Sequence, residues 1–218
     1  MLFLRCLLLL GFLLQTIPAS AQIPVELFGG DKRMTFDLMF FRFFKKKEGQ
    51  NSPFLFFSRE RAAVDYRQTT TAFLPQFGFT EAISWNPAWL KGFAPVLVGQ
   101  ILNRGTVGKA GIQYARIKPS LTMFGWVVSE LNEKPNCDLF WLIRFTPKLS
   151  ASLDFFAQAE FLNEIPMVPD RTFGFTQRAR IGIQHKSWQV GFGIDLSQRG
   201  LTTFTTTENS GAFLRHEF

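Results

Sequence analysis

The sequence predicts an all-β fold, a transmembrane antiparallel up-and-down β-barrel of twelve strands. Polar and apolar residues alternate along most of the chain, which is the period of a β-strand. Hydrophobic residues make up 46% of the chain and 27 residues are Phe, yet beyond residue 21 no apolar stretch approaches the ~18 residues that a membrane helix needs. A barrel strand needs only about 9–11 residues, and every second side chain faces lipid. The alternative count is ten strands, if two weak segments are not strands.

The N-terminal residues have the pattern of a secretory signal peptide. Arg5 gives a basic start, residues 6–14 are a short apolar run, and Ala19-Ser20-Ala21 is a small-residue cleavage site. A membrane-anchoring helix is disfavoured because the apolar run is short and is closed by Gln15 and Pro18. We therefore expect export across the inner membrane, with a signal peptide (1–21), a short periplasmic segment (22–32) and an outer-membrane barrel (33–218).

Four segments show the alternation most clearly: 33–44, 136–145, 173–184 and 188–196. In each, single polar or charged residues occupy one face of a strand whose other face is apolar. This is the pattern of a barrel with lipid outside and a polar interior. The expected strands are 33–44, 53–57, 62–68, 71–84, 89–101, 109–117, 121–129, 137–145, 151–162, 173–184, 188–197 and 211–218.

The connections fall into two classes that alternate from residue 70 onward. Short ones (84–89, 117–121, 146–151, 185–188) alternate with longer, more polar ones (102–109, 129–136, 162–171, 197–210). Outer-membrane barrels have short periplasmic turns and longer external loops, so both chain ends are expected in the periplasm. We further expect a tight turn at Ser58–Arg61 and an external loop at KKKEGQNS (45–52).

Two other fold classes fit less well. A helical fold is disfavoured because glycines, Pro75 and Pro95 interrupt the apolar segments, and because the repeat is two rather than 3.6 residues. A soluble β-sandwich would have to bury these phenylalanines between only two sheets.

The chain ends with GAFLRHEF (211–218), and this ending resembles the last strand of bacterial outer-membrane β-barrel proteins. The resemblance rests on Phe218 with Leu214 and Ala212 at alternate positions before it, and it departs at His216, where an apolar or aromatic residue is commoner. It implies that Leu214 and Phe218 are an assembly signal for the barrel assembly machinery, in the outer membrane of a diderm bacterium. Twelve-stranded members of this class include narrow substrate-specific channels and a phospholipase.

The sequence offers little for catalysis, and we expect no enzyme and no cofactor. The two histidines, His185 and His216, lie in an expected turn and on an expected lipid-facing position. Cys137 is the single cysteine after residue 21, so no internal disulfide forms. No GxSxG elbow, phosphate-binding loop or metal-ligand cluster is present in the sequence. Carboxylate-only catalysis by Asp154 and Glu160 is left open.

The expected interior of the barrel carries charges of both signs. Antiparallel register is expected to place Arg178 opposite Asp195 and Arg180 near Asp154, so that cations face anions across neighbouring strands. Such charges either select solutes in a narrow pore or fill the lumen with ion pairs. The expected pore-lining residues are Asp37, Asp65, Arg67, Asp138, Arg144, Asp154, Glu160, Arg178, Arg180, Asp195 and Arg215.

The leading functional expectation is a narrow passive channel for small polar or anionic solutes. The second is a plugged structural or adhesive barrel that works through threonine-rich LTTFTTTENS (201–210), and the third is a lipid-modifying enzyme. Expected partners are membrane lipid and, through KKKEG (45–49), lipopolysaccharide; nucleic acid is not expected, and the oligomeric state is open. The tryptophans expected in a membrane girdle are Trp85, Trp89, Trp141 and Trp188.

Overall fold

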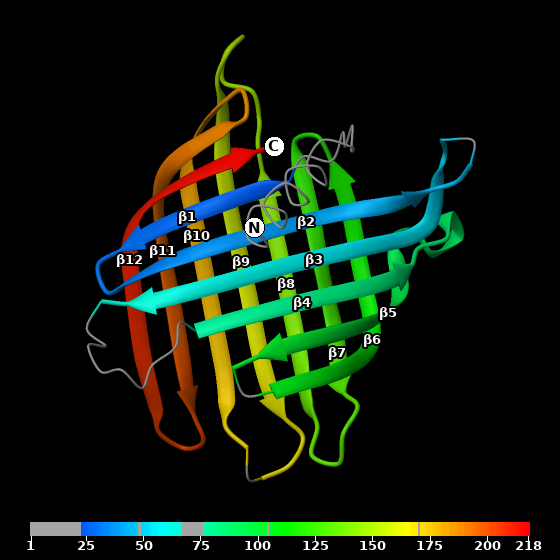
Figure 1. The fold of residues 1–218 in the computed structure, drawn as a ribbon, viewed down its shortest axis with the longest axis vertical. Coiled ribbons are helices and arrows are strands. Elements are labelled where there is room, and N and C mark those ends of the chain that lie inside the picture. Colours follow the sequence, from blue (N-terminus) through cyan, green and yellow to red (C-terminus); the bar gives the residue numbers. More distant parts are fainter. Residues whose placement is uncertain (1–22, 48, 67–75, 104, 170) are drawn as a thin grey trace, which may run out of the picture.

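The described residues form a closed antiparallel barrel of twelve strands in which each strand pairs with its neighbours in the chain (Figure 1). The structure is a computed structural model that describes residues 23–47, 49–66, 76–103, 105–169 and 171–218. The expected fold class is confirmed; the expected signal peptide lies outside the described residues. The strands are β1 (Pro24–Gly30), β2 (Arg33–Lys45), β3 (Asn51–Asp65), β4 (Gln76–Trp85), β5 (Phe93–Leu102), β6 (Gly105–Lys118), β7 (Leu121–Glu130), β8 (Asn136–Phe145), β9 (Asp154–Pro166), β10 (Phe173–His185), β11 (Trp188–Gly200) and β12 (Phe204–Glu217), with a 3-10 turn η1 (Ala88–Leu90).

Strand β1 closes the barrel, and this corrects the expectation that residues 22–32 precede it. Pro24–Gly30 pairs with β12 on one side and with β2 on the other. Glu26 and Phe28 alternate with exposed Leu27, so this short segment already has an interior and an exterior face. Its seven residues and two terminal glycines make the period too brief to recognise from the sequence alone.

Strand β3 is continuous through the expected turn at Ser58–Arg61, which corrects the division into 53–57 and 62–68. The whole segment Asn51–Asp65 pairs with β2, and its middle pairs with β4. The run of charges resembles a turn, but its two arginines point inward to carboxylates of other strands. The strand total is unchanged because the unrecognised β1 offsets the divided β3.

Two expected external loops are also corrected. Strand β11 extends to Gly200 and β12 starts at Phe204, so most of the threonine-rich segment 201–210 is paired strand rather than loop. The connection between β2 and β3 contains the lysine run, and strand alternation places it at the same end as Pro24 and Phe218. We call this end the terminus end; the lysine run is therefore opposite to the end at which it was expected.

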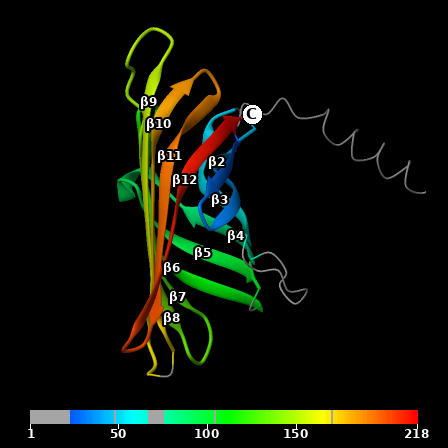
Figure 2. The same ribbon diagram turned by 90° about the vertical axis from the view of Figure 1, so that its left-hand side faces the viewer.

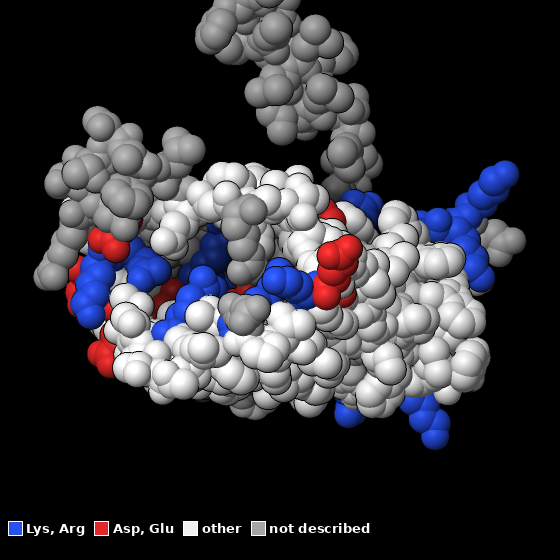
Figure 3. All heavy atoms as spheres, turned by 90° about the horizontal axis from the view of Figure 1, so that it is seen from below, with Lys and Arg blue, Asp and Glu red and all other residues white. Residues whose placement is uncertain are grey.

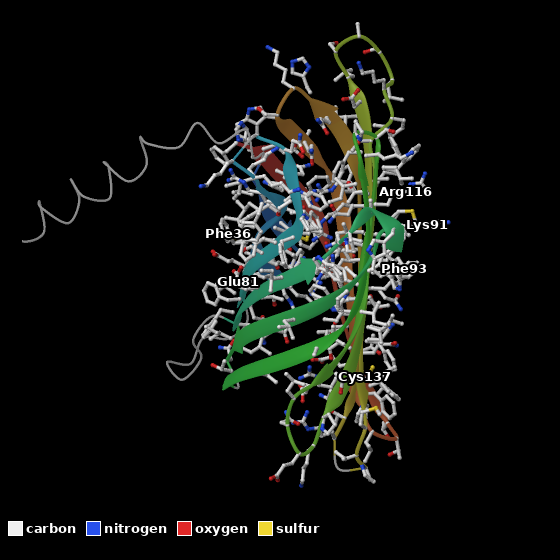
Figure 4. All side chains as sticks on the ribbon, turned by 90° about the vertical axis from the view of Figure 1, so that its right-hand side faces the viewer. Phe36, Glu81, Lys91, Phe93, Arg116 and Cys137 are labelled. Atoms are coloured by element: carbon white, nitrogen blue, oxygen red, sulfur yellow. The ribbon has the colours of Figure 1, made fainter. Side chains whose placement is uncertain are left out.

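The barrel is flattened, with two walls whose strands cross. Strands β1–β5 run across the front of β8–β12 in Figure 1, and the side view separates the two walls (Figure 2). Much of the outer surface is apolar: Phe192 is 74% exposed, Ile112 61% and Leu97 60%. Phe36 and Glu81 project from the same outer side (Figure 4), so this face also carries a carboxylate, which accepts a hydrogen bond from Ser58. Among the described residues, no helix is long and apolar enough to cross a membrane.

The side chain of Asn209 fastens the start of β2 to β12. Its amide oxygen accepts hydrogen bonds from the backbone N–H groups of Lys32 and Arg33, both at 3.0 Å, and its amide nitrogen donates to the Arg33 carbonyl at 3.2 Å. Asn209 is 1% exposed, so water does not replace these bonds if the amide is removed.

We expect Asn209→Ala to lower the free energy of unfolding by about 1–3 kcal/mol, because two backbone donors lose their acceptor. Urea unfolding followed by tryptophan fluorescence in detergent measures this change. Thr205→Ala on the same strand is the control, because Thr205 is exposed. Equal stability of the two variants would show that the Asn209 bonds contribute nothing.

Candidate functional site

The interior of the barrel contains a network of arginines and carboxylates that we call the arginine belt. It consists of six arginines and four carboxylates: Arg59, Arg61, Arg144, Arg178, Arg180 and Arg215 with Glu26, Asp37, Glu160 and Asp195. Strand alternation points all of them inward, from β1, β2, β3, β8, β9, β10, β11 and β12. These ten groups comprise two more cations than anions, and Glu217, which also faces inward on β12 and interacts electrostatically with Arg144, offsets one of them.

Arg59 and Arg61 of β3 connect strands on both sides of the lumen. Arg59 donates to Asp37 on the adjacent strand β2 at 3.0 Å, and to Glu160 on β9 at 2.9 Å. Arg61 donates to Asp37 at 2.9 Å and to Asp195 on β11 at 2.8 Å. Since β3 is not paired with β9 or β11, these contacts cross the interior rather than run along the wall.

The opposite wall is linked in the same way. Arg180 donates to Glu26 at 3.0 Å and to Asp195 at 2.8 Å, and Arg215 donates to the same Glu26 at 3.1 Å. Arg180 also lies over the ring of Phe28, with its guanidinium carbon 3.9 Å from the ring centroid. Glu26 is only 4% exposed, so its charge is compensated by these two guanidinium groups rather than by water.

Arg144 and Arg178 complete the belt at β9. Arg144 donates to the Gln158 amide oxygen at 2.8 Å, and Arg178 donates to Glu160 at 3.2 Å. Gln158 in turn donates to Glu160 at 2.8 Å. Arg144 thus reaches Glu160 only through a neutral amide, and the inward-facing Glu217 of β12 is the main carboxylate that compensates its charge.

On the other side of the interior, a large cluster of apolar side chains is buried. Phe57, Phe124, Trp126 and Phe140 pack as a ring cluster with centroids 5.0–6.1 Å apart. They join a core of buried residues from β2 to β8. The lumen is therefore asymmetric, with a charged side and an aromatic side.

A second, smaller charge cluster lies toward the end opposite the terminus end. Lys109 is 1% exposed and contacts Asp138, with Glu130 at 3.9 Å. Arg171, from the β9–β10 connection, pairs with Glu130. Figure 3 views this end and shows a hollow in which Lys and Arg side chains are visible.

Most residues expected in the interior do point there. Register places Arg178 opposite Asp195, as expected, but Arg180 lies opposite Gln158, not Asp154. The error arises because β9 continues to Pro166, which shifts the pairing by four residues. Asp154 pairs instead with Gln184 at the terminus end. Asp65 ends β3 opposite Arg33, Asp138 lies in the second cluster, and Arg67 is outside the described residues.

Sequence reasoning missed three central members of the belt, Glu26, Arg59 and Arg61. Each lies in a segment that was not recognised as a continuous strand. The available signal was that Arg59 and Arg61 follow Phe57 at the two-residue spacing of a strand, so a continuous strand places all three on one face. Charge density obscured that period.

Ser187 and His216 lie together on the outer face of the terminus end. The Ser187 hydroxyl is 3.0 Å from His216 Nε2, and the histidine ring packs between Trp188 and Phe218. His216 Nδ1 has no hydrogen-bond partner among the described residues, so no third group orients this pair as a catalytic base would be oriented. His185 is also at this end, on the Ser152 carbonyl. The described residues contain no metal-ligand cluster.

The expected girdle and assembly residues all lie on the outer surface. Trp85, Trp89 and Trp188 are 41%, 69% and 50% exposed at or near the terminus end, whereas Trp141 is in the middle of β8. Leu214 faces outward and is 46% exposed, and Phe218 is 71% exposed.

We expect Glu160→Gln to destabilise the barrel by about 3–5 kcal/mol, because Arg59 and Arg178 then lose a shared buried counter-ion. The double variant Arg59→Gln/Glu160→Gln should lose less than the sum of the single changes. Urea unfolding of the four proteins measures the coupling. Glu164→Gln is the control, because its partner Arg199 has a side chain 62% exposed and such pairs contribute about 0–1 kcal/mol. Equal effects at positions 160 and 164 would contradict a coupled belt.

No protein-family model and no curated protein sequence matches the chain. Its structure is similar to the KdgM porin in complex with disordered oligogalacturonate, with 10% identity, a TM-score of 0.51 and coverage of 90% of this chain and 99% of that one. A second structure of the KdgM porin has 8% identity, a TM-score of 0.50 and coverage of 90% and 99%. The NanC porin has 8% identity, a TM-score of 0.50 and coverage of 91% and 100%. The described chain therefore has the closed antiparallel barrel fold of these porins.

Proposed function

We propose that this protein is an outer-membrane barrel that acts as a narrow passive channel for small anionic solutes. The observation that carries the proposal is the arginine belt, in which six inward guanidinium groups face four carboxylates across the lumen. The apolar outer surface supports insertion in a membrane, because lipid rather than water is the favourable surrounding for such a face.

The belt favours anions for an electrostatic reason. Its carboxylates hold the guanidinium groups in fixed positions, while the excess of one cation that remains when the inward Glu217 is counted keeps the potential among these groups positive. An entering anion exchanges its water for N–H donors that are already in place. A cation meets the same excess charge and is repelled. Selection therefore follows from the sign of the excess rather than from a single binding residue.

The structural neighbours agree with this reading at the level of fold. One of them, the KdgM porin, is described in complex with oligogalacturonate, which is an anion. From this neighbour we carry into the proposal only that the solute is negatively charged. The outward positions of Leu214 and Phe218 on β12 are compatible with recognition by the barrel assembly machinery, which remains part of the proposal.

A second candidate, a plugged barrel without transport, is favoured by how densely the interior is filled. Arg59 and Glu160 have side chains only 11% and 4% exposed, and the aromatic cluster occupies the other side of the lumen. In that case the ion pairs of the belt only hold the strands together across a filled lumen. Conductance distinguishes the two candidates, and lipid hydrolysis assays of the same sample test an enzyme that uses Ser187 and His216.

Refolded barrel, verified by heat-modifiable gel mobility, should show discrete anion-selective conductance steps in a planar bilayer. Arg178→Gln should lower the ratio of anion to cation permeability, because it removes one cation from the belt, which then has no cationic excess. Lys134→Gln, an exposed residue of the β7–β8 connection, is the control for a charge change outside the lumen. A folded barrel that shows no steps would support the plugged candidate instead.

Trp126→Leu should raise the single-channel conductance while leaving selectivity unchanged, because it empties part of the aromatic side of the lumen without altering charge. The variant should also unfold at lower urea concentration, since it creates a cavity. An unchanged conductance in a folded variant would place the current path elsewhere than beside Trp126.

A further inference from the structure

The exposed charges of the barrel are distributed unevenly between its two ends. Nine exposed cations lie in the connections and strand ends of the terminus end, and we call them the basic collar: Arg42, Lys45, Lys46, Lys47, Lys91, Arg116, Lys118, Lys148 and Lys186. Among the described residues, this end has no exposed Asp or Glu; Glu48 lies outside the described residues. Glu217 faces inward and accepts a hydrogen bond from Gln189.

The opposite end lacks this imbalance. Its exposed charges among the described residues have both signs: Asp31, Glu133, Glu208, Lys134 and Arg199. The net charge of the sequence, +7, therefore conceals an unequal distribution of exposed charge between the two ends of the barrel. A surface with mixed charges needs only solubility as an explanation, whereas a ring of one sign predicts an oppositely charged partner.

The outer faces of two strands show at what depth the collar lies. Along β6, strongly exposed Ile112 is followed on the same face by Tyr114, then Arg116, then Lys118. This order is apolar, aromatic and then cationic, as expected for a path from the hydrocarbon region through the interface to the lipid headgroups.

Strand β2 and the η1 turn repeat this order. Phe36, Phe40 and Phe44 lie on the outer face of β2, which ends in the lysine run. Figure 4 shows Lys91, Phe93 and Arg116 projecting from the same outer side, with the two cations closer to the terminus end than Phe93. Trp85 and Trp89 pack against each other beside Lys91, with ring centroids 6.2 Å apart. Long Lys and Arg side chains at such positions reach the headgroup region.

We propose that the basic collar binds the phosphate groups of anionic phospholipids in the leaflet that surrounds the terminus end. Nine cations directly beyond an aromatic girdle match a layer of negative headgroups in both charge and depth. Such contacts retain a shell of anionic lipid around this end of the barrel and fix how deeply and in which orientation it sits. The proposal rests on the membrane location in the proposed function, but not on conduction.

Tryptophan quenching by brominated lipids tests the proposal in full-length barrel reconstituted in bilayers. Trp85, Trp89 and Trp188 report on the lipid beside the collar. Brominated phosphatidylglycerol should quench this fluorescence more strongly than brominated phosphatidylcholine, because it displaces phosphatidylcholine from the sites beside the collar. Arg116→Gln/Lys118→Gln should reduce that preference by about thirtyfold at low salt, because each of the two cations contributes about 1 kcal/mol at an anionic surface. High salt should also reduce it, because exposed charges are screened.

The matched control is Lys134→Gln/Arg199→Gln, which removes the same charge from the opposite end and should leave the preference unchanged. Equal quenching by the two lipids, or equal loss in both double variants, would overturn the proposal. So would a preference for lipopolysaccharide over phosphatidylglycerol that depends on Arg116 and Lys118, since the collar would then face the other leaflet. Conductance of the same samples separates the two proposals: an unaltered barrel that shows anion-selective steps but no lipid preference rejects the collar alone, whereas one that shows the lipid preference but no steps rejects the channel alone.

Discussion

Charged groups that point into a closed barrel must find their counter-ions inside it. A guanidinium group in this interior has little water around it, so each arginine that is not paired would cost several kcal/mol. Arg59, Arg61 and Arg180 meet this constraint by contacting carboxylates from more than one strand. The pairing holds only if β1, β2, β9 and β11 have one particular register. The belt therefore specifies strand alignment in a fold whose ladder hydrogen bonds tolerate many registers.

Division of the lumen into a charged side and an aromatic side follows from the same constraint. Ion pairs need partners across a short gap, which the flattened barrel supplies where β3 approaches β9 and β11. Phe57, only two residues from Arg59 on the same face, turns instead toward Phe124 and Trp126. A solute path in this barrel borders fixed donors on one wall and rings on the other. The strands that carry the belt thus select solutes by charge, and the strands that carry the aromatic cluster select them by size.

The outer surface is organised along the axis rather than around it. Apolar residues occupy the middle, aromatic residues follow, and exposed cations without exposed acidic residues beside them gather at the terminus end. Each depth corresponds to a layer of the membrane with its own polarity, and transfer free energy favours this order. The interior belt and the exterior collar carry positive charge for different reasons: the belt faces solute and is largely compensated, whereas the collar faces headgroups at an end with no exposed Asp or Glu among the described residues.

What the sequence determined by itself is the barrel, its strand period and the face on which most side chains lie. Those features depend on residues two apart in the same strand. In β11, for example, Gln189, Gly191 and Gly193 share one face while Val190 and Phe192 share the other, and this alternation is visible in the sequence. Only the tertiary structure decided that Arg59 and Arg61 belong to the interior, that Glu26 belongs to a strand, and that the lysine run lies at the terminus end. These depend on partners 101 to 154 residues away, such as Glu160 for Arg59 and Arg180 for Glu26. Closure of the ring brings those partners together, and no local pattern encodes a contact across the lumen.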